Sequence, residues 1–176
     1  MKIKYFIMSS IFSLNISYAN ILNIDSIKSD FRQIITNNQN AKISYSGKMY
    51  ATKSQNKALW RYISPVSKDI YYLGSGKLII VEPSLEQAIY AKLNKVPNIL
   101  KLLQNAKKTP SGLLVTNFNG IKYFIKANNN KIEKVSYTDE MQNRVNIIFS
   151  NEEINKNINS SIFKYKIPSN YDILEQ

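Results

Sequence analysis

The chain has 176 residues, a length suited to one domain with a sizeable core. It contains no cysteine and no histidine, which excludes disulfides, thiolate chemistry and the commonest proton shuttle and metal ligand. Its formal charge of +12 favours anionic partners such as phospholipid headgroups, lipopolysaccharide or an acidic protein face, unless the lysines only keep a sheet soluble. Because the lysines are spread along the chain and no nucleic-acid-binding motif occurs, we expect no nucleic acid as a partner.

The amino terminus has the pattern of an export signal. Lys2 and Lys4 precede an interrupted apolar stretch, and Ser17-Tyr18-Ala19 has the small-x-Ala form that a signal peptidase cuts. The apolar stretch is too short and too often broken by polar residues to span a bilayer. We therefore predict a cleaved signal peptide, residues 1–19, and a single exported domain, residues 20–176.

The first element predicted after the signal is an amphipathic helix over residues 24–35. Its apolar residues recur at helical spacing and would form one narrow stripe. They are Ile24, Ile27, Phe31, Ile34 and Ile35.

Strands are expected to follow this helix. Residues 43–52 show the clearest alternation in the chain, and residues 59–87 predict a meander with a turn ending at Pro65 and another built on residues 74–76. The meander strands are apolar on both faces, as in residues 78–81. A sheet with one wet face would alternate apolar with polar residues, so we expect apolar material against both faces.

The second half of the chain predicts another helix and more strands. Pro97 suits a first helical position, a run of leucines follows it, and Lys107 and Lys108 suit the end of the helix before Pro110. The strands expected after this helix are residues 113–118, 121–127, 131–137 and 144–149, with a weaker run over 162–165. Asn119-Gly120 and residues 128–130 supply hairpin turns. The whole pattern predicts an α+β fold with one antiparallel curved sheet of about ten or eleven strands and two or three helices on one side.

Two narrow helices cannot cover ten strands that are apolar on both faces in several places. Either the sheet curls on itself or it encloses a ligand, and the pattern leaves both possibilities open.

Several residues match, in order, the marks of one family. They are Phe31, Gln33, Gly47, Trp60, Tyr62, Pro65, Gly76, Lys77, Pro83, Glu86, Gln87 and Ala88. Through them the chain resembles the periplasmic lipoprotein carrier family, whose members are LolA-like chaperones. The resemblance implies an incomplete β-barrel closed by a helical lid around an apolar cavity for acyl chains. It also implies a monomer in the periplasm that uses no cofactor, no metal and no catalytic residue.

The resemblance further implies partners and a site. The cargo would be lipidated lipoproteins, received from an inner-membrane ABC-type release complex and passed to the outer membrane, with or without a receptor there. The residues expected to face the cavity from the sheet are Met49, Trp60, Tyr62 and Ile80, and those expected to face it from the lid are Ile27, Phe31, Ile34, Leu100 and Leu103. Ordinary core packing is the alternative role for each of them.

Two other functions fit the same fold. One is a periplasmic carrier of another amphiphile, such as a phospholipid, a glycolipid or lipopolysaccharide, and the other is a domain that senses envelope stress. The chain also departs from the family pattern, because residues 52–57 contain neither the Arg nor the Pro that often precedes the Trp. The sequence therefore predicts no arginine latch for the lid.

Overall fold

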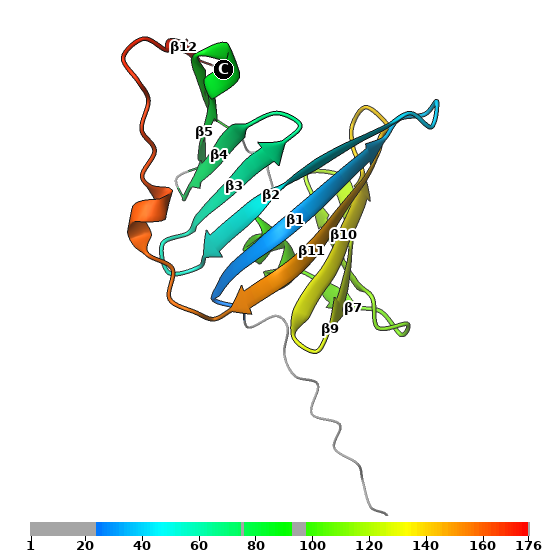
Figure 1. Ribbon diagram of the computed structural model, residues 1–176. Coiled ribbons are helices and arrows are strands. Elements are labelled where there is room, and N and C mark those ends of the chain that lie inside the picture. The colour runs from blue at the N-terminus through cyan, green and yellow to red at the C-terminus, as the bar shows by residue number, and fades with distance from the viewer. Residues whose placement is uncertain (1–23, 75, 93–97, 176) are drawn as a thin grey trace, which may run out of the picture.

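The structure is a computed structural model that describes residues 24–74, 76–92 and 98–175. The predicted signal peptide and Pro97 lie outside these residues. Twelve strands form one open sheet, in the order β12-β6-β5-β4-β3-β2-β1-β11-β10-β9-β8-β7 (Figure 1). Neighbouring strands are antiparallel, except that β12 runs parallel to β6.

The strand bounds follow the chain in order. They are β1 (Ser26–Thr36), β2 (Lys42–Thr52), β3 (Lys57–Ser64), β4 (Lys68–Leu73), β5 (Lys77–Glu82), β6 (Gln87–Lys92), β7 (Lys107–Lys108), β8 (Leu114–Phe118), β9 (Ile121–Asn128), β10 (Lys131–Thr138), β11 (Arg144–Ile154) and β12 (Asp172–Glu175). The described helices are α1 (Ile99–Gln104) and two short 3-10 helices, η2 (Pro83–Leu85) and η3 (Ser160–Phe163).

The strand β1 holds the two halves of the sheet together. It pairs along its length with β2 on one side and with β11 on the other, so the meander β1–β6 and the hairpins β8–β11 become one sheet. The helix α1 packs against β2 of the first half and β8 of the second. The sheet thus curves around a single short helix (Figure 1).

The predicted helix over residues 24–35 is wrong, because this segment is β1. Its inward face reads Ile27, Ser29, Phe31, Gln33 and Ile35, and the two polar residues on it hide the alternation. Ser29 is buried and its hydroxyl donates to the Ser150 carbonyl oxygen at 2.8 Å, while Gln33 accepts from Tyr62 at 2.8 Å. Since both polar side chains have partners, they are tolerated in the core.

The prediction of a lid of two or three helices is corrected as well, because the described residues hold one α-helix. Lys107 and Lys108, expected to end that helix, form the edge strand β7. The weak strand predicted over residues 162–165 is also wrong, because η3 covers its beginning and no strand follows there. The remaining predicted strands are confirmed, with β7 and β12 added to the expected number.

The meander has apolar material on both faces, as its sequence predicts. Its inward side chains join the main core around α1. Its outward side chains form a second core with the carboxyl-terminal segment that carries η3, which lies over β3 (Figure 1). This second core contains Tyr50, Leu59, Tyr71, Ile79, Val81 and Phe163. Runs that are apolar on both faces thus correspond to a sheet that packs against a core on each side.

Candidate ligand cavity

An apolar cavity of about 220 Å³ lies inside the curve of the sheet. One side of it, here called the first wall, is formed by β3, β4 and β5, and the opposite side, the second wall, by β9, β10 and β11. Its lining consists of Gln33, Trp60, Tyr62, Ile70, Leu78, Ile80, Ile99, Leu102, Tyr123, Val135, Tyr137 and Ile147. Among the residues that the structure describes, no lysine, arginine or carboxylate belongs to this lining, so the cavity suits an uncharged, largely apolar ligand.

Aromatic contacts fix the first wall. The ring of Phe31 packs edge-on against Trp60 and Tyr62, with centroids 5.0 Å apart in each pair. Such edge-to-face pairs are worth about 0.5–1.5 kcal/mol beyond the area they bury. Gly47 makes room for this cluster, because a Cβ there would lie 2.9 Å from Phe31 Cε1 and 2.0 Å from the carbonyl oxygen of Arg61.

One hydrogen bond crosses the cavity lining. The Tyr62 hydroxyl donates to Gln33 Oε1 at 2.8 Å. Burial raises the pKa of the Tyr62 hydroxyl well above its ordinary value of 10.0, and nearby Tyr137 and Tyr45 add to the shift. Tyr62 is therefore a neutral hydrogen-bond donor at any physiological pH.

The second wall contributes two more phenols. The rings of Tyr123 and Tyr137 lie 4.7 Å apart. Burial, with smaller contributions from Tyr137 and Glu140, raises the pKa of Tyr123 to about 12, and burial followed by the charge of Asp139 raises that of Tyr137. Both hydroxyls stay protonated at neutral pH.

The helix α1 closes the inner side of the cavity. Asn98 caps it, since its side chain accepts a hydrogen bond from the Leu100 backbone N–H at 3.0 Å. Its four apolar residues are all buried, which is unusual for a helix of six residues and follows from its position inside the curve of the sheet. Ile99 and Leu102 face the cavity, and Leu100 and Leu103 are buried in the surrounding core.

The structure separates the predicted site residues into three groups. Trp60, Tyr62 and Ile80 line the cavity. Met49, Ile27, Phe31, Leu100 and Leu103 are buried in the main core beside it. Ile34 is half-buried and lies, by alternation from Phe31, on the opposite face of β1.

Sequence reasoning missed the second wall. Tyr123, Val135, Tyr137 and Ile147 all lie in strands that were predicted correctly, and alternation would have placed the first three on shared inward faces. Nothing in the pattern indicated that these strands face the meander, because that depends on the long-range pairing of β1 with β11. Gln33 was noted only as a mark of the family resemblance.

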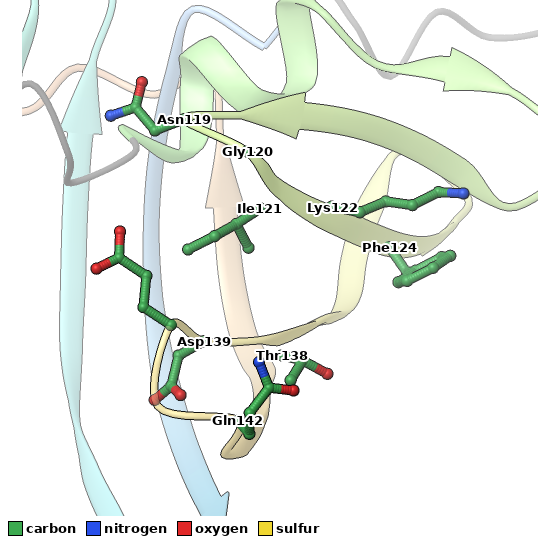
Figure 2. Close-up of a pocket in the computed structure, with 9 residues that line it drawn as sticks. Asn119, Gly120, Ile121, Lys122, Phe124, Thr138, Asp139 and Gln142 are labelled. Atoms are coloured by element: carbon green, nitrogen blue, oxygen red, sulfur yellow. The ribbon is translucent and has the colours of Figure 1, made fainter.

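A second hollow, of about 410 Å³, lies between the turn at Asn119-Gly120 and the turn that joins β10 to β11. Figure 2 shows Lys122 and Phe124 to one side of it and Asp139 and Gln142 to the other. Asp139 Oδ1 accepts from the backbone N–H groups of Met141, at 2.9 Å, and Asn143, at 2.8 Å, so this carboxylate stabilises its own turn. This polar hollow therefore offers less for an apolar ligand than the cavity between the walls.

Two further observations concern the described residues. No group of three or more carboxylates there could hold a metal ion. None of the helices in the described part is long and apolar enough to cross a membrane.

The fold of this open sheet is found in other proteins. A LolA superfamily protein from Nitrosomonas europaea matches 81% of this chain and 91% of its own with a TM-score of 0.51 and 9% identity. An uncharacterized conserved protein from Thermus thermophilus matches 88% and 93% with a TM-score of 0.54 and 8% identity. At such low identity the likeness shows the fold alone.

Sequence relatives define the family more closely, although no protein-family model matches the chain. An outer-membrane lipoprotein carrier protein from Campylobacter jejuni is 39% identical over 153 residues, which are 87% of this chain and 88% of the relative. A protein of the same name from Wolinella succinogenes is 33% identical over 155 residues, covering 88% and 89%. The chain belongs to the outer-membrane lipoprotein carrier protein family.

Proposed function

We propose that this protein binds the acyl chains of lipoproteins in the cavity between the two walls and carries them from the inner to the outer membrane. The observation that supports this most is the cavity itself, which is lined by apolar side chains and neutral polar groups from β1, from the strands of the two walls and from α1. The names of the relatives specify the cargo. The carrier acts in the periplasm as a monomer, after removal of residues 1–19.

The physical need for a carrier follows from the chemistry of the cargo. At roughly 0.8 kcal/mol per CH₂, exposing one sixteen-carbon chain to water costs on the order of 12 kcal/mol. A lipoprotein with several chains would therefore leave a bilayer far too slowly without a receiving cavity. An inner-membrane ABC-type release complex would supply the energy for loading, and an outer-membrane receptor or the membrane itself would take the cargo.

The cavity must expand to hold such a cargo. Its 220 Å³ is below the roughly 300–1,000 Å³ of pockets that enclose drug-sized ligands. The helix α1 is the element that we expect to move, because it fills the space between the walls and touches only β2 and β8 among its larger contacts. Trp60, Tyr62 and Ile80 would then contact acyl chains directly, and Met49, Phe31, Leu100 and Leu103 would do so only as α1 shifts.

A transfer assay tests this proposal. Mature protein is added to inner-membrane vesicles that hold a labelled triacylated lipoprotein and an energised release complex, and the label in the soluble fraction is measured. We expect a soluble one-to-one complex with the wild type and a loss of at least tenfold with Trp60→Asp or Ile80→Glu, because a charge in the cavity opposes apolar binding. Ile63→Asp is the matched control, since Ile63 lies in the same strand and is 55% exposed.

The outcomes separate the alternatives. Equal losses with Trp60→Asp and Ile63→Asp, in variants whose circular dichroism is that of the wild type, would place the binding site elsewhere. If no lipoprotein is released while the purified protein holds free phospholipid or glycolipid, the carrier of another amphiphile replaces the lipoprotein carrier.

A further inference from the structure

Four polar side chains lie among the described residues that line the cavity. They are Gln33, Tyr62, Tyr123 and Tyr137, and the other eight are Trp60 and aliphatic residues. Packing alone does not call for hydroxyl and amide groups in an apolar cavity, because each has to find a hydrogen-bond partner when a ligand displaces water. These four side chains therefore indicate that the ligand itself offers hydrogen-bonding groups.

The hydrogen-bond inventory of the cluster is dominated by donors. Tyr62 donates its only hydroxyl proton to Gln33 Oε1, which leaves the two amide N–H groups of Gln33 directed away from that bond. Within the described residues, no protein acceptor is recorded for these N–H groups or for the hydroxyls of Tyr123 and Tyr137. Every fully buried side-chain nitrogen or oxygen in that part of the chain has a partner, so these donors are accessible.

The donors come together from both walls. The rings of Tyr123 and Tyr137 are 4.7 Å apart, and Tyr137 is close enough to influence the titration of both Tyr123 and Tyr62. Burial keeps all three phenols protonated and hence able to donate. Tyr137 precedes the last residue of β10, so the cluster lies toward the end of the sheet that carries the β10–β11 turn.

We propose that this cluster is a subsite for the carbonyl oxygens of esterified acyl chains, with the hydrocarbon lying beyond it against Trp60 and Leu78. An ester carbonyl accepts hydrogen bonds and donates none, which complements a cluster with unpaired donors. This inference rests on the proposed function and adds to it a preference for acyl over alkyl chains.

A matched pair of single-chain lipids tests the subsite. The probes are 1-palmitoylglycerol, an ester, and 1-hexadecylglycerol, the ether that lacks the carbonyl. Trp60 is the one tryptophan of the chain and lines the cavity, so its fluorescence reports occupancy. We expect the wild type to bind the ester at least about fivefold more tightly than the ether, the effect of one net hydrogen bond.

Variants assign that preference to the cluster. Tyr137→Phe and Gln33→Leu should reduce the ester affinity about fivefold more than the ether affinity, so that the preference for the ester is lost. Tyr45→Phe is the control, because its ring packs 5.8 Å from Tyr62 but does not line the cavity. Equal binding of ester and ether by the wild type, or a preference that survives both cluster variants, would overturn the subsite and leave the acyl-chain cavity intact. If neither lipid alters Trp60 fluorescence or competes with the other, the proposed function itself fails.

Discussion

The two walls of the cavity are built differently. The first wall belongs to a sheet that is covered on both faces, by the main core inside and by the carboxyl-terminal segment outside. Among the described residues, the second wall is covered on its inner face only, and its outer face carries Lys122, Lys126 and Lys134. Even an aliphatic residue there, Ile148, is 41% exposed.

This difference indicates which wall yields when a ligand enters. Local opening costs least where few apolar contacts are lost, and the second wall has one packed face to lose instead of two. The aromatic cluster of Phe31, Trp60 and Tyr62 adds to the cost on the first side. We therefore expect the first wall to act as a fixed template, while α1 and the second wall adapt to the ligand.

The largest effect should come from removing the outer cover of the first wall. Phe163 is 2% exposed in the second core, so Phe163→Ala should lower the free energy of unfolding by about 4 kcal/mol. Phe124→Ala, on the outer face of the second wall, should cost about 1 kcal/mol or less, because that ring is half-exposed beneath the Lys122 ammonium. Urea denaturation measures both, and equal losses would contradict the difference between the walls.

A smaller effect should follow from crowding the aromatic cluster. Gly47→Ala places a methyl group against the Arg61 backbone and the Phe31 ring, and we expect a loss of about 3 kcal/mol together with a blue or red shift of Trp60 fluorescence. Gly120→Ala is the control, since its φ is +78° but no atom lies within 4 Å of the added Cβ. It should cost only backbone strain, about 1–2 kcal/mol, and leave the fluorescence unchanged.

Local patterns in the sequence were enough to predict most of the sheet. Alternation identified β2, and runs that are apolar on both faces identified β3 and β5. The strands β8 to β11 were identified as short runs between turns that contain Asn or Gly at positive φ, as at Asn119 and Asn129. The same method failed at β1, where Ser29 and Gln33 occupy inward positions and the remaining isoleucines fall by coincidence at helical spacing. The segment is a strand because it pairs along its length with β2 and β11, and hydrogen bonds to Ser150 and Tyr62, which are distant in sequence, satisfy its two inward polar side chains.

Only the first wall of the site could be predicted from the sequence, again because local patterns do not encode long-range pairing. Trp60, Tyr62 and Ile80 belong to the meander, whose local pattern and family marks are strong. The second wall depends on the crossover that brings β11 beside β1, and no local pattern encodes that pairing. The cover on the outer face of the meander was expected, but its source was not, since the segment around Ile158 and Ile167 has no strand or helix periodicity.

The smallest expected effect concerns the buried phenols and separates the walls by titration. Tyr123 of the second wall has a pKa of about 12 in the folded state against 10.0 when unfolded, so the folded state holds its proton more tightly. Such a group contributes stability that is complete below pH 10 and is lost as the pH rises toward 12. The pKa of Tyr62 in the first wall is raised further, so its contribution to stability persists to higher pH.

In a spectrophotometric titration of tyrosinate, Tyr123→Phe should remove a step near pH 12, and Tyr62→Phe should not. Bound 1-palmitoylglycerol should move the Tyr123 step upward, because the ester excludes water from the phenol, and a step that ignores the ligand would place Tyr123 outside the occupied space.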